Sequence, residues 1–309
     1  MRRALSYGSI AAAAVAALAA ALYFVFPETL FRLATEAQRR SAGLVRREVQ
    51  VDDHRIPYLE GGTGETIVLL HGFTDSKDGW TAFARHLRGY HLVIPDVPGF
   101  GESSQVAADD YGIESQAARI DRFVEVLHLG RFHLAGASMG GAVAATYAAR
   151  HPDKVLTLML EDTAGAPSPT KSAFMIELEK SDNLLTPRNA EEFDKLVPVV
   201  FAHPPTLLPP FKKIAVAVMV AHREFNRKIW RDALAGPTSL APVLPLIRAR
   251  VLIVWGEKDR VCDVGGVAFL EQNLKHDPTV ILPDTGHCPE KERPEEAAKA
   301  YVSFLRKPR

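Results

Sequence analysis

Cysteine is scarce in this chain of 309 residues, which has only Cys262 and Cys288. Two cysteines cannot form a disulfide framework, although they could pair with each other in an oxidising compartment. No C-x-x-C or H-E-x-x-H pattern occurs, so we expect no metal and no other cofactor. Positive and negative residues number 37 each, and the formal net charge is zero. This balance gives no reason to expect a nucleic-acid partner or an acidic substrate.

Charge is also absent from residues 4–26, which are almost entirely apolar and rich in alanine. The stretch is about as long as the roughly 20 residues that a membrane-spanning helix needs. We favour an uncleaved anchor over residues 1–27, because apolar residues continue through Phe26 and Tyr23 suits a membrane interface. The alternative is a signal peptide cleaved near residues 17–19, which would give a secreted or periplasmic protein.

Residues 28–48 predict a basic, amphipathic linker that lies on a membrane surface, and a solvated linker helix is the alternative. Its arginines alternate with apolar residues and are Arg32, Arg39, Arg40, Arg46 and Arg47. Arg2 and Arg3 favour an N-terminus that stays inside the cell, whereas the later arginines favour the opposite orientation. Both orientations of the chain across the membrane are therefore kept as alternatives.

From residue 49 onward, short apolar runs alternate with stretches of helical periodicity. Eight runs predict strands at residues 49–51, 56–60, 67–70, 92–94, 132–135, 155–160, 251–255 and 279–282. Apolar residues recur at helical spacing over residues 113–127, 139–149, 267–274 and 295–305. This alternation is typical of an α/β protein with a mostly parallel sheet and helices on both faces. We expect residues 49–165 and 247–309 to form this core.

Residues 166–246 interrupt the alternation. They are rich in proline and apolar segments and contain no strand-like run. We expect a helical insertion that forms a lid over the strand ends.

The most specific motif is Gly-Ala-Ser-Met-Gly-Gly at residues 136–141, between a predicted strand and a predicted helix. G-x-S-x-G in this context predicts a sharp turn that exposes the serine hydroxyl at the end of the sheet. Glycines are needed because the turn brings neighbouring backbone very close. The helix N-terminus would also favour a developing anion. We therefore predict that Ser138 is a nucleophile.

A serine hydroxyl needs a nearby base to become an effective nucleophile. His287 follows the last predicted strand and is the predicted base. Asp259 follows the preceding strand and is the predicted acid, which would hold one tautomer of the imidazole. The order serine, acid, histidine is the one expected for such an arrangement. Glu257 and Asp263 are local alternatives to Asp259, and Asp162 after an earlier strand is another.

Two backbone N–H groups should stabilise the oxyanion of the reaction. One belongs to Met139, directly after the predicted nucleophile. The other is expected from Phe73, in the loop after the third strand. His71 in the same loop is expected to brace it, and Asp96 in the next loop is expected to have an architectural role.

These motifs, together with Gly286-His287, resemble the α/β-hydrolase superfamily over residues 49–305. More narrowly, the chain resembles the membrane-anchored monoacylglycerol lipases and related bacterial lipases and esterases. The features that carry this narrower resemblance are the N-terminal anchor, His71-Gly72-Phe73 followed by Lys77-Asp78 and Trp80, Ser138-Met139-Gly140-Gly141, Asp263-Val264-Gly265-Gly266 shortly after Asp259, and Glu292-Arg293-Pro294. The resemblance implies an α/β-hydrolase fold with an eight-stranded, mostly parallel sheet, and an ester hydrolase that acts on acylglycerols.

The expected activity is hydrolysis of lipid esters, such as monoacylglycerols, through an acyl-enzyme on Ser138. An anchored enzyme would meet substrates that partition into membranes, and part of the apolar lid could line an acyl pocket. A carbon–carbon bond hydrolase of the aromatic-degradation type, a cofactor-free perhydrolase and a non-catalytic ligand-binding scaffold are the alternatives. The anchor counts against the first of these, and the complete set of Ser138, Asp259 and His287 counts against the last.

Overall fold

The computed structural model describes residues 10–12, 15, 23–180, 184–275 and 279–307. Most of the predicted anchor over residues 1–27 lies outside these ranges. Among the helices within them, none combines the length and the apolar character needed to cross a membrane.

Eight strands form one sheet in the order β1-β2-β4-β3-β5-β6-β7-β8. The first two pairings, β1 with β2 and β2 with β4, are antiparallel, and all later pairings are parallel. The strands are β1 (Leu44–Val51), β2 (His54–Gly62), β3 (Thr66–Leu70), β4 (His91–Pro95), β5 (Phe132–Ala137), β6 (Val155–Glu161), β7 (Arg250–Gly256) and β8 (Val280–Leu282). All eight predicted strands are confirmed, and β1 begins at Leu44 rather than at residue 49.

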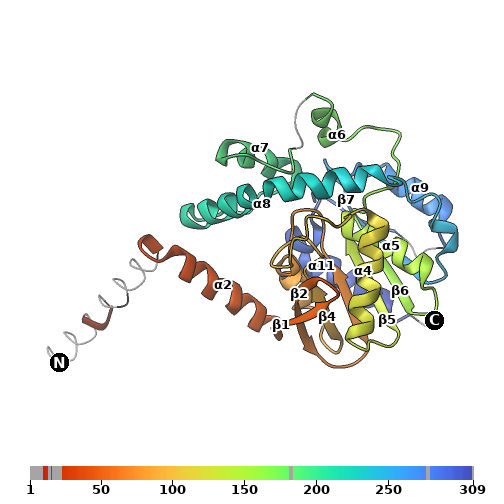
Figure 1. Cartoon of the computed structure of the whole chain (residues 1–309), viewed down its shortest axis with the longest axis horizontal. Helices are drawn as coiled ribbons and strands as arrows, with labels where there is room; N and C mark the ends of the chain where they lie inside the picture. The colour runs from red at the N-terminus through yellow and green to blue at the C-terminus, as the bar shows by residue number, and fades with distance from the viewer. Residues whose placement is uncertain (1–9, 13–14, 16–22, 181–183, 276–278, 308–309) are drawn as a thin grey trace.

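Helices cover both faces of the sheet (Figure 1). On one face, α4 (Ile113–Val126), α5 (Met139–Arg150) and α9 (Gly266–Asn273) pack against strand residues that include Val68 and Leu70. On the other face, α3 (Thr81–Ala84) and α11 (Pro294–Leu305) pack against residues that include Ile67 and Leu69. Successive side chains of a strand point to opposite faces, so both alternating sets of β3 are buried. This explains why the strand is a continuous apolar run.

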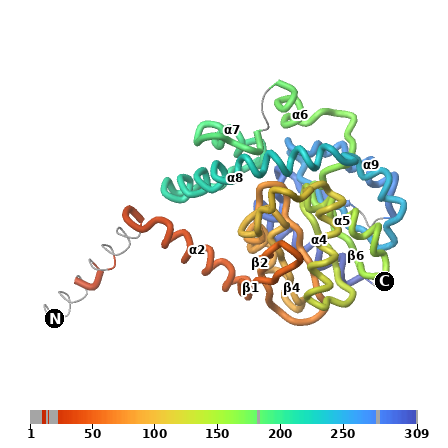
Figure 2. The backbone as a smooth tube through the Cα atoms, in the orientation of Figure 1, coloured from red at the N-terminus to blue at the C-terminus, as the bar shows by residue number. Residues whose placement is uncertain are grey.

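Helices occupy the insertion between β6 and β7. They are α6 (Ala173–Leu178), α7 (Ala190–Val200), α8 (Pro209–Ala235) and the short η2 (Leu244–Leu246), and the described part of residues 166–246 contains no strand. Figures 1 and 2 show α6, α7 and α8 together on one side of the sheet. Their buried residues Phe174 and Leu196 pack with Val261, which follows β7, and with Phe73, which follows β3. The insertion therefore contacts the segments that follow the carboxyl ends of β3 and β7.

The basic segment before the core is divided between α2 (Pro27–Ser41) and β1. Arg39 of α2 is buried and donates two hydrogen bonds of 2.7 Å to the carboxylate of Asp78. Arg46 pairs with Glu102 at 2.7 Å, and Arg47 pairs with Glu60. Three of the five arginines predicted for a membrane surface are thus used in ion pairs with the α/β core.

A buried ion pair joins the loops after β3 and β4. Lys77, in η1 (Lys77–Trp80), donates from Nζ to Asp96 at 2.8 Å and to Glu102 at 3.0 Å. The Asp96 carboxylate also accepts the backbone N–H groups of Lys77 and Glu102, at 2.8 and 2.9 Å. Buried charges are tolerated when their hydrogen bonds are satisfied in this way. The architectural role expected of Asp96 agrees with these contacts.

Substituting Glu102 by glutamine tests this cluster through its pH dependence. Burial raises the pKa of Glu102, but hydrogen bonds and charge from Lys77 and Arg46 outweigh it and lower the pKa from 4.5 to about 2. Because the folded-state pKa is the lower one, ionised Glu102 stabilises the fold above about pH 4.5, and this contribution is lost as the pH falls toward about 2. We expect Glu102→Gln to lower the free energy of unfolding near neutral pH. The difference in this free energy between the variant and the wild type should shrink as the pH falls from about 4.5 toward about 2.

The measurement is urea denaturation over a pH series. Glu295→Gln is the control, because Glu295 is exposed on α11 and its substitution should change stability less than that of Glu102. A difference for Glu102→Gln that stays constant down to the acid end of the series would contradict this account.

Candidate active site

Ser138 is the single residue between the end of β5 and the start of α5. Its φ of 52° and ψ of −120° lie in a strained region for a residue with a side chain. Its backbone N–H donates to the carbonyl of Glu161 at 2.9 Å, and its carbonyl accepts the N–H of Ala164 at 3.0 Å. The neighbouring strand β6 therefore holds the turn in place, as expected for a nucleophile elbow.

Close backbone contacts explain the glycines of the motif. A Cβ atom at Gly136 would lie 2.2 Å from the carbonyl oxygen of Gly140, and one at Gly140 would lie 2.4 Å from that of Leu70. At Gly72, in the loop after β3, a Cβ would lie 3.1 Å from Ser138 Cβ and 3.7 Å from Ser138 Oγ. This loop thus passes directly beside the serine hydroxyl.

The structure brings Asp259 and His287 together. His287 Nδ1 donates to Asp259 Oδ2 at 2.7 Å, and both side chains are buried. Asp259 Oδ1 accepts the N–H groups of Val261 and Cys262, at 2.7 and 3.0 Å. Because an ionised carboxylate only accepts hydrogen bonds, the proton of a neutral His287 is on Nδ1 and Nε2 is the acceptor. This is the tautomer that a general base requires.

The insertion also contacts the histidine. The backbone N–H of His287 donates to the carbonyl of Val200, at the end of α7, at 2.7 Å. A Cβ at the preceding Gly286 would lie 2.5 Å from Ala202 N, so α7 and its exit pack closely on the histidine loop. Ser138 lies at the same edge of the sheet, but its hydroxyl makes no hydrogen bond within the described ranges, and the bond from Ser138 to His287 is not formed in this conformation.

The two predicted oxyanion donors are available. Neither Phe73 N–H nor Met139 N–H has a hydrogen-bond acceptor among the residues that the structure describes. His71 fixes the Phe73 loop, since Nδ1 donates to Gly72 O at 2.8 Å and Nε2 accepts Val97 N–H at 2.9 Å. Burial lowers the pKa of His71, which favours the neutral ring. These contacts agree with a bracing role.

Among the described residues, none of the three alternatives to Asp259 is hydrogen-bonded to His287. Glu257 is exposed and accepts the N–H of Asp284, and Asp263 accepts a hydrogen bond from Ser168. Asp162 is fully buried, and its Oδ1 accepts Gly256 N–H at 2.8 Å. Burial raises the pKa of Asp162, and the charge of Asp259 raises it further.

A set of charged residues that includes the half-buried pair Lys291 and Asp75 and the buried acids Glu290 and Glu161 was not predicted from the sequence. Lys291, in α10 (Pro289–Glu292), donates to Asp75 at 2.6 Å, and its Nζ lies 3.7 Å from Glu290. Burial raises the pKa of Glu290 to about 7, and burial together with the charge of Glu290 raises the pKa of Glu161. The one sequence signal for this set is the run of charged residues after His287.

Apolar side chains form the wall between the site and the insertion. Phe73 contacts Trp230 of α8 and Phe100, each with ring centroids 5.5 Å apart. Trp230 also contacts Phe174 of α6, at 5.8 Å. Leu185 and Leu196 extend this wall.

Cys262 and Cys288 are free thiols and do not form the disulfide that two cysteines could have made. Burial raises the pKa of both Cys262 and Cys288, which keeps them protonated. Ligand atoms of Cys262, Asp259 and His287 lie within 4.8 Å of one another, a grouping that could be taken for a metal site. The direct bond of 2.7 Å between Asp259 and His287 is that of an imidazole held by its carboxylate partner.

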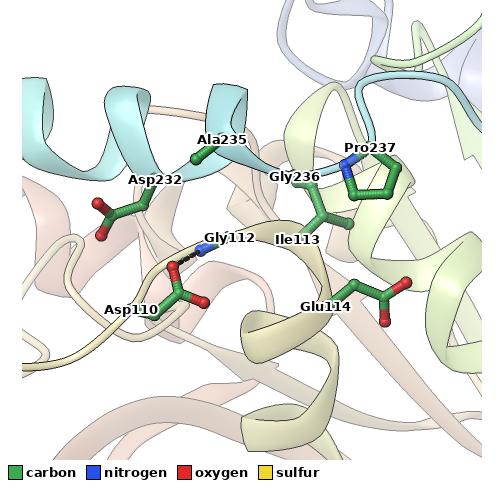
Figure 3. A pocket seen from close by; sticks show the side chains of 8 residues that line it. All are labelled: Asp110, Gly112, Ile113, Glu114, Asp232, Ala235, Gly236 and Pro237. Atoms are coloured by element: carbon green, nitrogen blue, oxygen red, sulfur yellow. Dashed lines mark hydrogen bonds between the residues drawn. The ribbon is translucent and has the colours of Figure 1, made fainter.

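Two hollows lie on the surface away from these residues. One of about 220 Å³, drawn in Figure 3, is lined by residues near the start of α4 and the end of α8, including Asp110 and Asp232. The other, of about 910 Å³, lies between the start of α2 and the first half of α8. Neither is lined by Ser138, Asp259 or His287.

The sheet, the serine turn at the end of β5 and the histidine–aspartate pair after the later strands define a serine hydrolase. The chain belongs to the alpha/beta hydrolase fold family, whose sequence profile matches residues 65–206. It is 32% identical to Lipase 1 of Psychrobacter immobilis over 81% of this chain and 80% of that protein. It is 33% identical to monoacylglycerol lipase ABHD6 of Bos taurus over 92% and 89% of the two chains. The chain is also 41% identical in sequence to a membrane phospholipase A whose crystal structure superposes with a TM-score of 0.89. The match covers 99% of this chain and 98% of that protein.

The substitution Gly136→Ala tests the packing of the serine turn. The added Cβ would lie 2.2 Å from backbone, so the turn must move. We expect the free energy of unfolding to fall by about 1–3 kcal/mol and hydrolytic activity to fall about 10²-fold through displacement of Ser138. Thermal unfolding and ester hydrolysis measure the two effects.

Gly130→Ala is the matched control, because a Cβ there meets no atom within 4 Å. Its stability should stay within about 0.5 kcal/mol of the wild type. Equal behaviour of the two variants would show that the close contact at Gly136 has no role.

Proposed function

We propose that this serine hydrolase cleaves carboxylic esters of lipids, with monoacylglycerols or similar acylglycerols as substrates, through an acyl-enzyme on Ser138. The observation that carries the proposal is the pairing of His287 with Asp259 at the sheet edge where Ser138 turns, beneath an apolar wall. The names of the relatives, which are lipases, monoacylglycerol lipases and a membrane phospholipase A, support the substrate class.

Acylation of Ser138 is the first half of the proposed reaction. Ser138 Oγ attacks the ester carbonyl carbon while His287 Nε2 takes the hydroxyl proton, and Asp259 stabilises the imidazolium that forms. The N–H groups of Phe73 and Met139 stabilise the negative oxygen of the tetrahedral intermediate. His287 then returns the proton to the leaving alkoxide, so that an alcohol departs and the acyl-enzyme remains.

Hydrolysis of the acyl-enzyme repeats these steps with water as the nucleophile. His287 Nε2 takes a proton from water as its oxygen attacks the acyl carbonyl, and the same two N–H groups stabilise the second oxyanion. The proton then passes to Ser138 Oγ, the ester bond breaks and a carboxylic acid is released.

The apolar wall supports a lipid acyl group as the substrate. Phe174, Leu196 and Trp230 belong to the insertion and meet Phe73, the predicted oxyanion donor, at the site. We propose that the insertion, residues 166–246, is a lid whose inner side binds the acyl chain. Each buried methylene contributes about 0.8 kcal/mol, so binding should increase with chain length.

We also propose that residues 1–27 hold the enzyme at a membrane through one N-terminal span. The apolar segment 4–26 supports this, and Phe24, Val25 and Phe26 at its end are exposed. The name of the membrane phospholipase A relative is consistent with such an anchor. The mass of the mature chain distinguishes an anchor from a cleaved signal peptide, because cleavage near residues 17–19 would shorten it.

Ser138→Ala tests the proposed nucleophile. We expect covalent labelling by a fluorophosphonate probe to disappear and hydrolysis to fall roughly 10³-fold or more, because no other group replaces the hydroxyl. Ser303→Ala, at an exposed position of α11, is the control and should be labelled like the wild type. Labelling that persists in Ser138→Ala would refute the assignment, and an unlabelled wild type would favour a non-catalytic scaffold.

A panel of esters tests the substrate class. With p-nitrophenyl esters below their micelle concentrations, kcat/KM should rise from acetate to decanoate by up to about fourfold per methylene. Trp230→Ala should lower kcat/KM for decanoate more than for acetate, since it removes part of the wall. Among mono-, di- and triacylglycerols of one chain length, the monoacylglycerol should react fastest. A preference for acetate that Trp230→Ala leaves unchanged would contradict a lipid substrate.

A further inference from the structure

Asp162 is a buried acid beside the proposed catalytic acid, and the reaction described above does not use it. It directly follows β6. In the sheet, β6 lies between β5, which ends just before Ser138, and β7, which is followed by Asp259. Its side chain is fully buried, and its φ of 41° lies in the left-handed region. Strained residues of this kind cluster at functional sites.

The hydrogen bonds around the two carboxyl groups indicate which one carries a proton. Asp259 accepts three hydrogen bonds, from the N–H groups of Val261 and Cys262 and from His287 Nδ1. Asp162 accepts one, from Gly256 N–H at 2.8 Å. Its Oδ2 has no donor as a partner within the described ranges and lies within hydrogen-bonding reach of the Asp259 side chain. Two adjacent carboxyl groups of this kind share one proton, which stays on the group with fewer donors.

The surroundings of Asp162 favour the same protonation state. The titratable groups around it are Glu161 at the end of β6, Asp259 and Cys262 after β7, and Cys288 after β8. His287 is bonded to the far partner of this set, Asp259. Lys291 acts on Glu161 and Cys288, but it is paired with Asp75 and is not among the main charges that act on Asp162. A second negative charge beside Asp259 would therefore lack a cation of its own. Burial is the largest cause of the raised pKa of Asp162, followed by the charges of Asp259 and Glu161.

We propose that Asp162 is a positioning residue whose neutral carboxylic acid donates a hydrogen bond to the Asp259 carboxylate and so holds Asp259 against His287. The inference rests on the proposed function, because it gives Asp259 and His287 their roles. Asp162 bridges two strands in this arrangement: Oδ1 holds the backbone of Gly256 and the protonated Oδ2 holds the side chain of Asp259.

Asparagine is the informative replacement, since its amide oxygen can accept from Gly256 and its amide nitrogen can donate to Asp259. We expect kcat/KM of Asp162→Asn on a water-soluble p-nitrophenyl ester to stay within about threefold of the wild type, with the same pH profile. Asp162→Ala loses the donor, and we expect kcat/KM to fall at least tenfold. The acidic limb of the pH profile of kcat/KM for Asp162→Ala should move to higher pH, because a less stabilised Asp259 carboxylate attracts the proton on His287 more strongly.

Two further measurements separate this role from a purely structural one. In an Asp259→Ala background, adding Asp162→Ala should change kcat/KM less than twofold, because a residue that acts through Asp259 has no further effect once Asp259 is gone. Infrared difference spectroscopy should show a protonated carboxyl band in the wild type that Asp162→Asn lacks, and this band can be read even if the alanine variant does not fold.

Several outcomes would overturn the inference. They are an Asp162→Asn variant as impaired as Asp162→Ala, an Asp162→Ala variant within twofold of the wild type, and the absence of the protonated carboxyl band. Failure of the proposed function gives a different result, since the wild type itself would then show no hydrolysis that depends on Ser138.

Discussion

The backbone approaches itself so closely around Ser138 that side chains cannot be accommodated beside it. Gly136 lies against the carbonyl of Gly140, Gly140 lies against that of Leu70, and Gly72 lies against Ser138 itself. These contacts join three segments: the turn, the end of β3 and the loop that carries Phe73. Because all three meet at backbone distance, the serine hydroxyl and the two free N–H groups have fixed relative positions. The site therefore depends first on the absence of Cβ atoms.

Strand order then determines which side chains reach this turn. The strands β5, β6, β7 and β8 are adjacent and parallel, so Ser138, Asp162, Asp259 and His287 all follow strands that end at one edge. Short contacts connect them across the sheet, from Ser138 N–H to the Glu161 carbonyl and from Gly256 N–H to Asp162. The insertion adds a further backbone contact, since the Val200 carbonyl at the end of α7 accepts the N–H of His287. Residues that are far apart in the chain are thus linked by backbone groups as well as by their side chains.

Features with a local sequence signal could be predicted, whereas those that depend on tertiary packing could not. Strands buried on both faces are continuous apolar runs, and the serine turn requires glycines, so both are visible in the sequence. Asp259 and His287 are indicated by their order along the chain and by their positions after predicted strands. β1 is an edge strand with several exposed residues, and its polar first half looked like a linker. The pairing of Arg39 with Asp78 depends on how α2 packs, which local periodicity does not encode. The burial of Asp162 is likewise tertiary, so the sequence marked it only as an alternative acid.

The buried and half-buried ionisable groups around His287 follow one electrostatic rule. The cation, Lys291, is paired with Asp75, on the side of α10 that faces the Phe73 loop. Closer to Asp259, the acids Asp162 and Glu161 have raised pKa values because they are fully buried beside other acids. Asp259 alone receives three donors, including the imidazole, so the negative charge concentrates on the carboxylate that contacts His287. Neutral acids can surround that carboxylate without competing for the imidazole proton. Ionised ones would add repulsion, which Lys291, already paired with Asp75, offsets only in part.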